Sequence, residues 1–291
     1  MKKEHSGAAL VALSALCYGF MAIFVKLAYA GNINMITTLS GRFILASIFM
    51  WAAVWIGRQP FSISGREMAS LLLLSLLGYG GSSTFFFASL QLIPASLALF
   101  IHPVMVSLFE VIVYRYPLTI KKISALVLST GGLVLVLGNV SGGVDPRGIV
   151  LALGAALCYT AYLLYGNGVV RRHPPVVTTA YVLSFAAAGF TLYGLAGGGI
   201  DFSFPAGSWI WLVAMAMVST SMGILFLFAG LRRIEAGKAS IVSTIEVVIT
   251  VGFSALLFRD VLTPAQIVGG MAVLLGIIIL QAQKFTYFDP L

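Results

Sequence analysis

Ionisable side chains interrupt several long apolar stretches of this sequence, and two of them stand far from any polar segment. Glu246 lies about ten residues into the stretch that contains "IVSTIEVVIT", and His102 lies within "LFIHPVMVS". A deep carboxylate can bind an ammonium group or exchange a proton, and an imidazole can do the latter near neutral pH. These residue types therefore indicate polar-ligand binding or proton transfer inside an apolar medium.

A structural role is the alternative for both residues. Glu246 could be a protonated or internally hydrogen-bonded glutamate, because an unpaired carboxylate at this depth costs about 3 kcal/mol. His102 could be a packing residue whose ring nitrogens are satisfied locally. Pro103 follows it, frees a backbone carbonyl and weakens a helix, as in helices that line cavities.

Two cations stand nearer the ends of apolar stretches. Lys26 ends "YGFMAIFVK", and Arg42 lies in "GRFILA". One interpretation is snorkelling, in which apolar stems cross the hydrocarbon and charged ends reach its surface. The other is a fixed charge at the extracellular mouth of a pathway, where it pairs with a substrate carboxylate or organises a gate.

The elements that must position these residues are transmembrane helices. Hydrophobic residues make up 60% of the chain, charged residues only 9%, and the mean hydropathy is +1.04, whereas soluble domains carry roughly 25% charged residues. Only helices and closed barrels satisfy their backbone in lipid, and barrel strands are short and alternating. Ten non-alternating runs predict an all-α protein with ten helices: 7–29, 34–56, 67–90, 94–114, 120–138, 148–170, 175–197, 207–231, 236–258 and 264–283.

Lysine and arginine predict the orientation. With a cytoplasmic N-terminus, the outer loops hold only Arg147 and Arg259, and Lys26 and Arg42 lie within runs. Cytoplasmic loops are enriched in these residues, so both termini are expected inside. The net charge of +8 is thus explained by topology, and nucleic acid is not expected as a partner. The inner loops and termini hold Lys2, Lys3, Arg58, Arg66, Arg115, Lys121, Lys122, Arg171, Arg172, Arg232, Arg233, Lys238 and Lys284.

The second half of the sequence repeats the first. "ALCY" at 15–18 recurs at 156–159, Thr37 and Thr38 match Thr178 and Thr179, and the region 85–98 matches 226–239, all at an offset of 141. The offset becomes 144 near the end, where Gly132 matches Gly276. The mid-chain copy also argues against a cleaved signal peptide at the N-terminus. We therefore expect two units, residues 1–144 and 145–291, with five helices each.

An odd number of helices makes the second unit sit upside down, and the loop charges agree. The uncharged loop "AGNINMI" corresponds to "RRHPP", for example. Inverted repeats around a mid-membrane site are common in secondary transporters. His102 corresponds to Ser243, which lies one turn from Glu246, so all three are expected to face one central axis.

Small, polar and aromatic residues complete the candidate cavity. "GYGGSST" (78–84) and its counterpart "VSTSMG" (218–223) fall at mid-membrane and supply Tyr79, Ser82 and Ser83. Close helix packing alone also explains small residues. Tyr18, Tyr159 and Tyr162 could add aromatic surface to a pocket, or could be interfacial or core residues. Cys17 and Cys158 are expected to be packing residues, and no metal or cofactor is expected.

The sequence resembles the drug/metabolite transporter superfamily, specifically its EamA-type ten-helix members. The resemblance rests on the motifs already quoted together with "FFFASLQLIPASLA", "HPVMVSLFE" and "LTPAQIVGGMAVLLGIIIL", and it spans essentially the whole chain. Two positions depart from the family pattern: "VYRYPLT" lacks a Gly-Glu pair before Leu-Thr, and Val247 stands where proline is frequent. The resemblance implies a bacterial inner-membrane exporter, similar to YddG-type carriers of aromatic and other neutral amino acids.

The expected function is export of small neutral metabolites, foremost amino acids, by alternating access in a monomer. A sugar or cationic-drug carrier is the alternative. The sequence has no P-loop, so ATP-driven transport is disfavoured. It also has no His-Glu-x-x-His and no Gly-x-Ser-x-Gly, so no catalytic residues are expected and an integral-membrane enzyme is a distant alternative.

Overall fold

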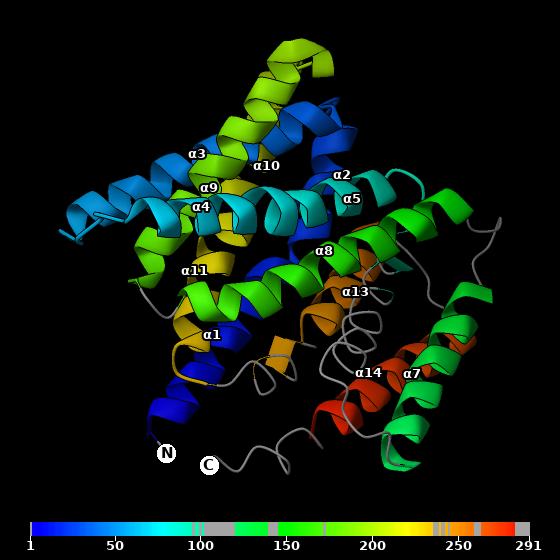
Figure 1. Ribbon diagram of the computed structural model, residues 1–291. Helices are drawn as coiled ribbons and strands as arrows, with labels where there is room; N and C mark the ends of the chain where they lie inside the picture. The colour runs from blue at the N-terminus through cyan, green and yellow to red at the C-terminus, as the bar shows by residue number, and fades with distance from the viewer. Residues whose placement is uncertain are drawn as a thin grey trace.

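The computed structural model describes residues 2–94, 97–98, 101, 120–138, 145–170, 173–234, 239, 242–243, 245–258 and 263–282. Every regular element within these ranges is helical, which confirms the all-α prediction (Figure 1). The predicted fourth run, 94–114, falls mostly outside the described residues, and so does His102. The other nine predicted runs correspond to described helices.

The boundaries agree closely with the apolar runs. The first predicted run, 7–29, is divided at Phe20. The third and eighth predicted runs, 67–90 and 207–231, each contain a π-helical segment. The described elements are α1 (Lys2–Gly19), α2 (Met21–Ala30), α3 (Met35–Ile56), α4 (Gly65–Leu73), η1 (Leu74–Gly80), α5 (Gly81–Ser89), α7 (Ile120–Gly138), α8 (Pro146–Val170), α9 (Pro175–Tyr193), η2 (Gly194–Gly198), η3 (Ala206–Ser208), α10 (Trp209–Ala214), η4 (Met215–Met222), α11 (Gly223–Leu231), α13 (Ile245–Phe258) and α14 (Pro264–Ala282).

Helix starts follow local chemistry. The Asn34 side chain accepts a hydrogen bond from the Thr37 N–H at 2.8 Å and caps α3. Ser64 and Glu67 form a reciprocal capping box at α4, and Pro175 occupies the first position of α9, where its missing N–H costs nothing. These caps determine the residue at which each of these helices begins.

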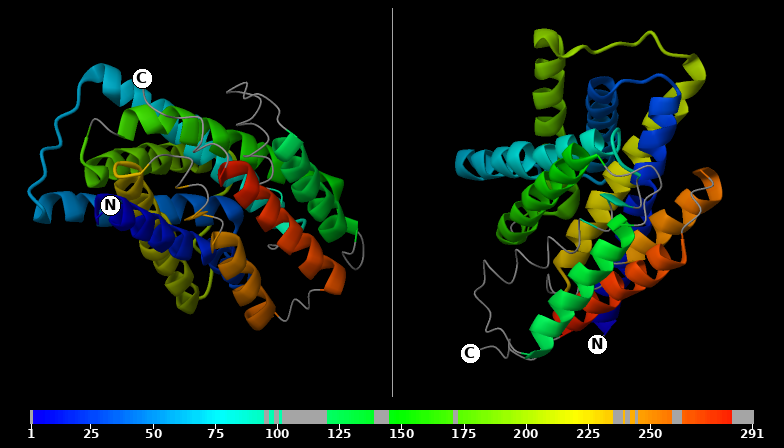
Figure 2. Two further views of the ribbon diagram at one scale, coloured as in Figure 1. Left: turned by 90° about the horizontal axis from the view of Figure 1, so that it is seen from below. Right: turned by 90° about the vertical axis from the view of Figure 1, so that its right-hand side faces the viewer.

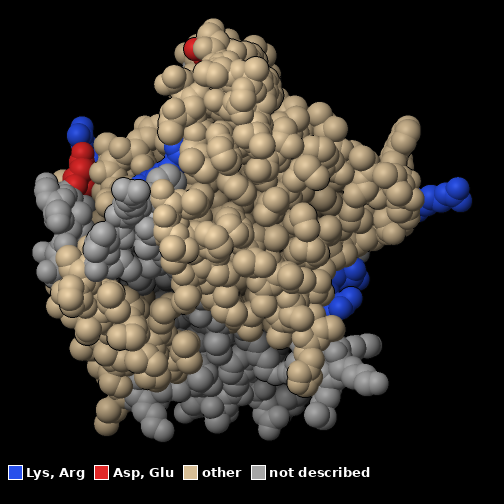
Figure 3. Space-filling view, turned by 180° about the vertical axis from the view of Figure 1, so that it is seen from behind, with Lys and Arg blue, Asp and Glu red and all other residues tan. Residues whose placement is uncertain are grey.

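Long apolar helices dominate the exterior. Within the described residues, five helical segments are long and apolar enough to cross a membrane: 5–30, 35–56, 65–89, 175–197 and 206–231. Large apolar side chains such as Trp55, Leu77 and Leu256 are well exposed. On the face seen in Figure 3, the described charged residues lie near the margins of a broad uncharged surface. This pattern suits a surface surrounded by lipid.

The first helix of each unit packs against the third helix of the other unit. α1 lies along α11, and α8 lies along α5. The two contacts match in detail: a Cβ on Gly7 would lie 2.6 Å from Ile234 Cγ2, and a Cβ on Gly148 would lie 2.5 Å from Ile93 Cγ2. In the repeat alignment Gly7 corresponds to Gly148, and Ile93 corresponds to Ile234. The sequence repeat is therefore also a structural repeat.

Corresponding helices of the two units run antiparallel, which shows the inversion directly. α7 and α14 lie side by side in both views of Figure 2. A Cβ on Gly132 would meet the Gly269 carbonyl oxygen at 2.5 Å, and one on Gly276 would meet that of Ala125 at 2.6 Å. As the residue number rises on one helix, it falls on its neighbour. Two copies of one helix can pair in this way only if the copies point in opposite directions.

The second helices of the units, α3 and α9, pair in the same manner. Trp51 donates its indole N–H to Ser184 Oγ at 2.8 Å. Toward the other end, Thr37 Oγ1 donates to the Asp201 carbonyl oxygen at 3.1 Å. This central antiparallel pair joins the two units through side chains on both ends.

π-helical segments occupy equivalent positions in the two third helices. η1 begins at Leu74 and η4 begins at Met215, and these two residues correspond in the repeat alignment. Nothing in the sequence analysis predicted them. A π turn shifts the register of a helix and recurs at functional sites. Here η1 includes residues 78–80 of "GYGGSST", and η4 includes residues 218–222 of "VSTSMG", the stretches that the sequence placed in the candidate cavity.

Contacts between connecting segments agree with the predicted sides. His173 Nε2 lies 3.1 Å from Glu67 Oε1. His173 belongs to a connecting segment and Glu67 to the first turn of α4, and both lie at ends assigned to the cytoplasm. Ser208 Oγ donates to the Gly31 carbonyl oxygen at 3.0 Å, and both belong to segments assigned to the outside. A miscounted helix would place such partners on opposite sides. Which side is cytoplasmic stays a prediction from the charge count.

Replacing Gly132 by leucine is expected to weaken the packing of α7 on α14, because the new side chain meets the backbone of Gly269. Overpacking of this kind destabilises by about 1–3 kcal/mol. Gly131 is the matched control, since no atom lies within 4 Å of a Cβ built there. The apparent melting temperature of the purified protein should fall for G132L and stay near wild type for G131L. Equal melting temperatures for the two variants would contradict the described pairing.

Candidate functional site

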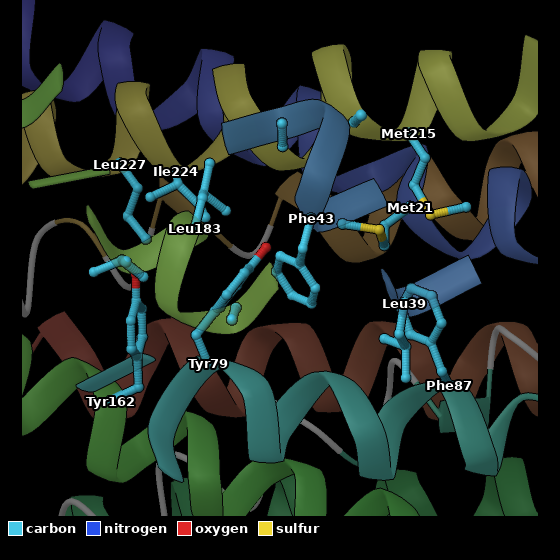
Figure 4. Close-up of a cluster of buried hydrophobic side chains, with 14 of the residues drawn as sticks. Met21, Leu39, Phe43, Tyr79, Phe87, Tyr162, Leu183, Met215, Ile224 and Leu227 are labelled. Carbon is cyan, nitrogen blue, oxygen red and sulfur yellow. The ribbon is translucent and has the colours of Figure 1, made fainter. Parts of the chain in front are cut away.

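Four tyrosines form the centre of the candidate site, and we call them the tyrosine cluster: Tyr18, Tyr79, Tyr159 and Tyr162. They come from α1, η1 and α8, so both units contribute. Tyr162 lies 5.5 Å from Tyr79 and 6.0 Å from Tyr159 between ring centroids. Figure 4 shows Tyr79 and Tyr162 projecting from neighbouring helices into the same buried layer. The structure thus brings together all four tyrosines that the sequence singled out.

The polar ends of this cluster are incompletely satisfied. The hydroxyls of Tyr18, Tyr79 and Tyr162 are buried and have no hydrogen-bond partner within the described part of the chain. Buried hydroxyls are normally paired, because leaving one without a partner costs about 1–3 kcal/mol. Three such groups in one place are donors and acceptors suited to a polar ligand.

Close packing also shapes this region. A Cβ on Gly78 would lie 2.9 Å from the Cβ of Tyr162, and one on Gly223 would lie 3.2 Å from the Tyr18 ring. These two glycines therefore let tyrosines approach the third helix of the opposite unit. For Gly78 and Gly223, the packing interpretation is supported by the geometry.

Glu246 lies on α13, which packs against α1. Its carbonyl oxygen lies 3.4 Å from a Cβ built on Gly19, the residue that follows Tyr18. The Thr250 hydroxyl holds α13 against α1 by donating to the Gly19 carbonyl oxygen at 2.7 Å. Glu246 therefore lies next to the helix that carries Tyr18, and the role of its carboxylate stays a prediction.

Ser243 precedes Glu246 by three residues and lies just before the first residue of α13. Its hydroxyl donates to the Ala239 carbonyl oxygen at 2.9 Å. This bond leaves the acceptor lone pairs of the hydroxyl available. His102, the residue that the sequence paired with Ser243, lies outside the described residues, so the common face of these residues stays a prediction.

Arg42 differs from the snorkelling interpretation. Its side chain is only 1% exposed and points into the protein, seven residues into α3. The guanidinium donates to Ser83 Oγ at 2.7 Å and to Met21 Sδ at 3.0 Å. Cation–π contacts to neighbouring rings explain why it does not reach for the surface. Ser82, the neighbour of Ser83, is also buried, at 7% exposure.

Lys26 lies at an open pocket of about 700 Å³, on the side that the charge count assigns to the exterior. The end of α2, the turn before α3 and the residues after α5 form its walls, including Tyr29, Asn34 and Gln91. The placement agrees with a residue at a mouth, and its role there stays a prediction. Its counterpart in the second unit is Asn167, at an offset of 141.

The sequence analysis missed the residues that surround Arg42. Phe43 and Phe87 lie 4.2 Å and 4.6 Å from the guanidinium carbon, measured to their ring centroids. Met21 supplies the sulfur acceptor. Their hydrophobicity is ordinary for a transmembrane helix, so composition carried no signal. Only the unusual position of an arginine, next to Phe43 in an apolar run, could have indicated an aromatic cage.

Comparison with known proteins identifies the architecture. The model of the EamA-like transporter family matches residues 5–138 and again 146–281. A crystal structure of another protein superposes with a TM-score of 0.74 over 96% of this chain and 99% of that chain, at 17% identity. The likeness to that structure concerns the fold.

Curated relatives are transporters by name. An uncharacterized transporter of Archaeoglobus fulgidus is 27% identical over 94% of this chain and 95% of its own length. The threonine/homoserine exporter RhtA of Escherichia coli K12 is 28% identical over 69% of this chain and 68% of its own length. With two successive family matches, antiparallel pairing of corresponding helices and apolar spanning helices, the chain is a multi-pass membrane protein that belongs to the EamA-like transporter family.

Proposed function

We propose that this protein is a secondary transporter that exports small neutral amino acids, aromatic ones among them. The observation that carries the proposal is the tyrosine cluster between the two units, with Glu246 on the adjacent helix α13. A carboxylate there can bind a substrate ammonium group, and the rings can contact an apolar side chain. The relative RhtA, named a threonine/homoserine exporter, supports the same substrate class.

Alternating access is the mechanism that the inverted repeat favours. Each unit places its first helix against the third helix of the other, in α1 on α11 and α8 on α5. If the two units exchange conformations, the opening moves from one side of the membrane to the other. The π-helical segments η1 and η4 lie in the helices that would have to adjust.

The remaining expectations are part of the same proposal. The division between units falls after residue 144, within the gap left by the two family matches. We infer a bacterial inner-membrane location, cytoplasmic termini and function as a monomer. The ligand is a small molecule without nucleic acid, metal or cofactor as partner, and no enzymatic step is proposed.

A sugar or cationic-drug carrier is the second candidate. Recognition of a drug cation would be favoured by several deep carboxylates. Among the described residues, Glu246 is the carboxylate beside the tyrosine cluster. A small zwitterion carries its own negative charge, whereas a drug cation must be neutralised by carboxylates of the protein. The single carboxylate of Glu246 therefore suits a zwitterion better than a large cation.

Uptake into proteoliposomes distinguishes these substrates. We expect saturable uptake of labelled phenylalanine, methionine or threonine, and little uptake of a sugar or a quaternary ammonium dye. The physical reason is the pairing of an ammonium group with Glu246 beside aromatic rings. Liposomes without protein provide the background. Movement of the sugar or dye with no movement of any amino acid would overturn the proposed substrate class.

Replacing Glu246 by glutamine is expected to lower amino-acid uptake at least tenfold, because the neutral amide cannot pair with an ammonium group. A tenfold loss corresponds to about 1.4 kcal/mol. Asp201→Asn is the matched control, since its carboxylate serves a loop by accepting from the Ser203 N–H.

The same pair of variants tests proton coupling. If Glu246 exchanges protons with the solvent during transport, the pH dependence of uptake should disappear in E246Q and persist in D201N. An unchanged pH profile in E246Q would remove this residue from a coupling role. Uptake equal to wild type in E246Q would remove it from substrate binding as well.

A further inference from the structure

A buried arginine lies beside the tyrosine cluster. The guanidinium carbon of Arg42 lies 4.2 Å from the centroid of Phe43, 4.6 Å from that of Phe87 and 5.7 Å from that of Tyr79. The arginine is buried, with only 1% of its surface exposed. In Figure 4, Met21, Phe43, Tyr79 and Phe87 project into the same region of the core. Three aromatic rings and a methionine thus enclose this cation.

The hydrogen bonds of this guanidinium are few. It carries five N–H donors, and its partners are the neutral acceptors Ser83 Oγ and Met21 Sδ. Its Nε is buried without a partner in the described part of the chain. Among the residues that the structure describes, no carboxylate lies at ion-pair distance from Arg42. A buried cation of this kind normally has an anion beside it.

We propose that Arg42 binds the carboxylate of the transported amino acid. This inference rests on the proposed function and assigns the specificity for the acid group. The Tyr79 ring lies 5.7 Å from the guanidinium carbon, so a carboxylate bound at Arg42 would lie beside the tyrosine cluster.

The hydrogen-bond acceptors that now contact the Arg42 guanidinium can be replaced by a substrate carboxylate. A guanidinium binds a carboxylate through two parallel N–H···O bonds, which is stronger than a bond to a neutral acceptor. A thioether sulfur is a weak acceptor, so the bond to Met21 is easily replaced. The Ser83 hydroxyl can keep its bond to one nitrogen while the remaining donors, including the Nε–H, bind the ligand.

The open pocket near Lys26 lies next to a residue that contacts this site. Tyr29 lines that pocket and donates its hydroxyl to the Phe87 carbonyl oxygen at 3.2 Å. The Phe87 ring in turn covers Arg42. A carboxylate that enters from this pocket would therefore have to pass Tyr29 and Phe87.

The test compares an amino acid with its amide, which keeps the ammonium group and loses the negative charge. We use whichever of phenylalanine, methionine and threonine is carried fastest, and measure its uptake and that of its amide in proteoliposomes. Wild type should prefer the acid at least tenfold. R42Q should lose at least tenfold of the acid uptake, with amide uptake changed less than threefold, so that the preference disappears.

Control variants separate this role from a structural one. R42K keeps a positive charge and should retain part of the preference, whereas R232Q removes an exposed arginine and should behave as wild type. An undiminished preference in R42Q would overturn the proposal. So would an equal loss for the acid and the amide in R42Q, because a purely structural arginine predicts that result.

A measurement on the wild-type protein avoids dependence on folded variants. Ligands that bind the native state raise its melting temperature with concentration. The amino acid should raise the melting temperature of the purified transporter, and its amide should do so only at concentrations at least tenfold higher. Equal stabilisation by both would overturn the assignment of Arg42 and leave the proposed function standing. If no amino acid is transported and none raises the melting temperature, both the assignment of Arg42 and the proposed function are overturned.

Discussion

Lipid gives apolar helices little reason to associate with one another, and this constraint governs the whole structure. Association must come from close contact and from polar bonds between helices. The contacts at Gly132 and Gly276 supply the first. Side-chain hydroxyls supply the second: Ser14 donates to the Gly223 carbonyl oxygen at 2.7 Å, and Thr250 donates to that of Gly19. Because such bonds can break and re-form without exposing apolar surface to water, they are compatible with the proposed movement of the two units.

The same constraint explains the position of the candidate site. Polar groups are costly in hydrocarbon, so they gather where both units cover them. The tyrosine cluster lies where η1, α1 and α8 meet, with Glu246 and Arg42 near it. A substrate bound there would contact residues of both units, so any relative movement of the units would change its surroundings.

Much of the fold could be predicted from the sequence. The apolar runs gave helix bounds within a few residues, as for 34–56 and the observed Met35–Ile56. The constant offset between the two copies and the loop charges gave the inverted repeat, because topology in lipid depends on length and charge, which are local properties. The π-helical segments were not predicted, since they depend on how the third helices fit against their neighbours.

The candidate site was predicted in part. Tyrosine and glutamate stand out in apolar runs, and the repeat predicted a common axis for His102, Ser243 and Glu246. The environment of Arg42 could not be predicted, because an arginine at this depth in an apolar run can either snorkel to the membrane surface or stay buried. The outcome depends on whether an aromatic enclosure is nearby, and Phe87 belongs to a different helix, distant along the chain.

The repeat is symmetric in backbone but not in charge. The alignment of the two units pairs Arg42 with Leu183, which is fully buried, and Lys26 with Asn167. If the units exchange conformations as proposed, the helices would trade places but these cations would not. The opening on one side of the membrane would then have a different electrostatic potential from the opening on the other. A protein built from two similar halves would thereby present an anion with unequal affinities at its two entrances, and the membrane potential would act on this difference.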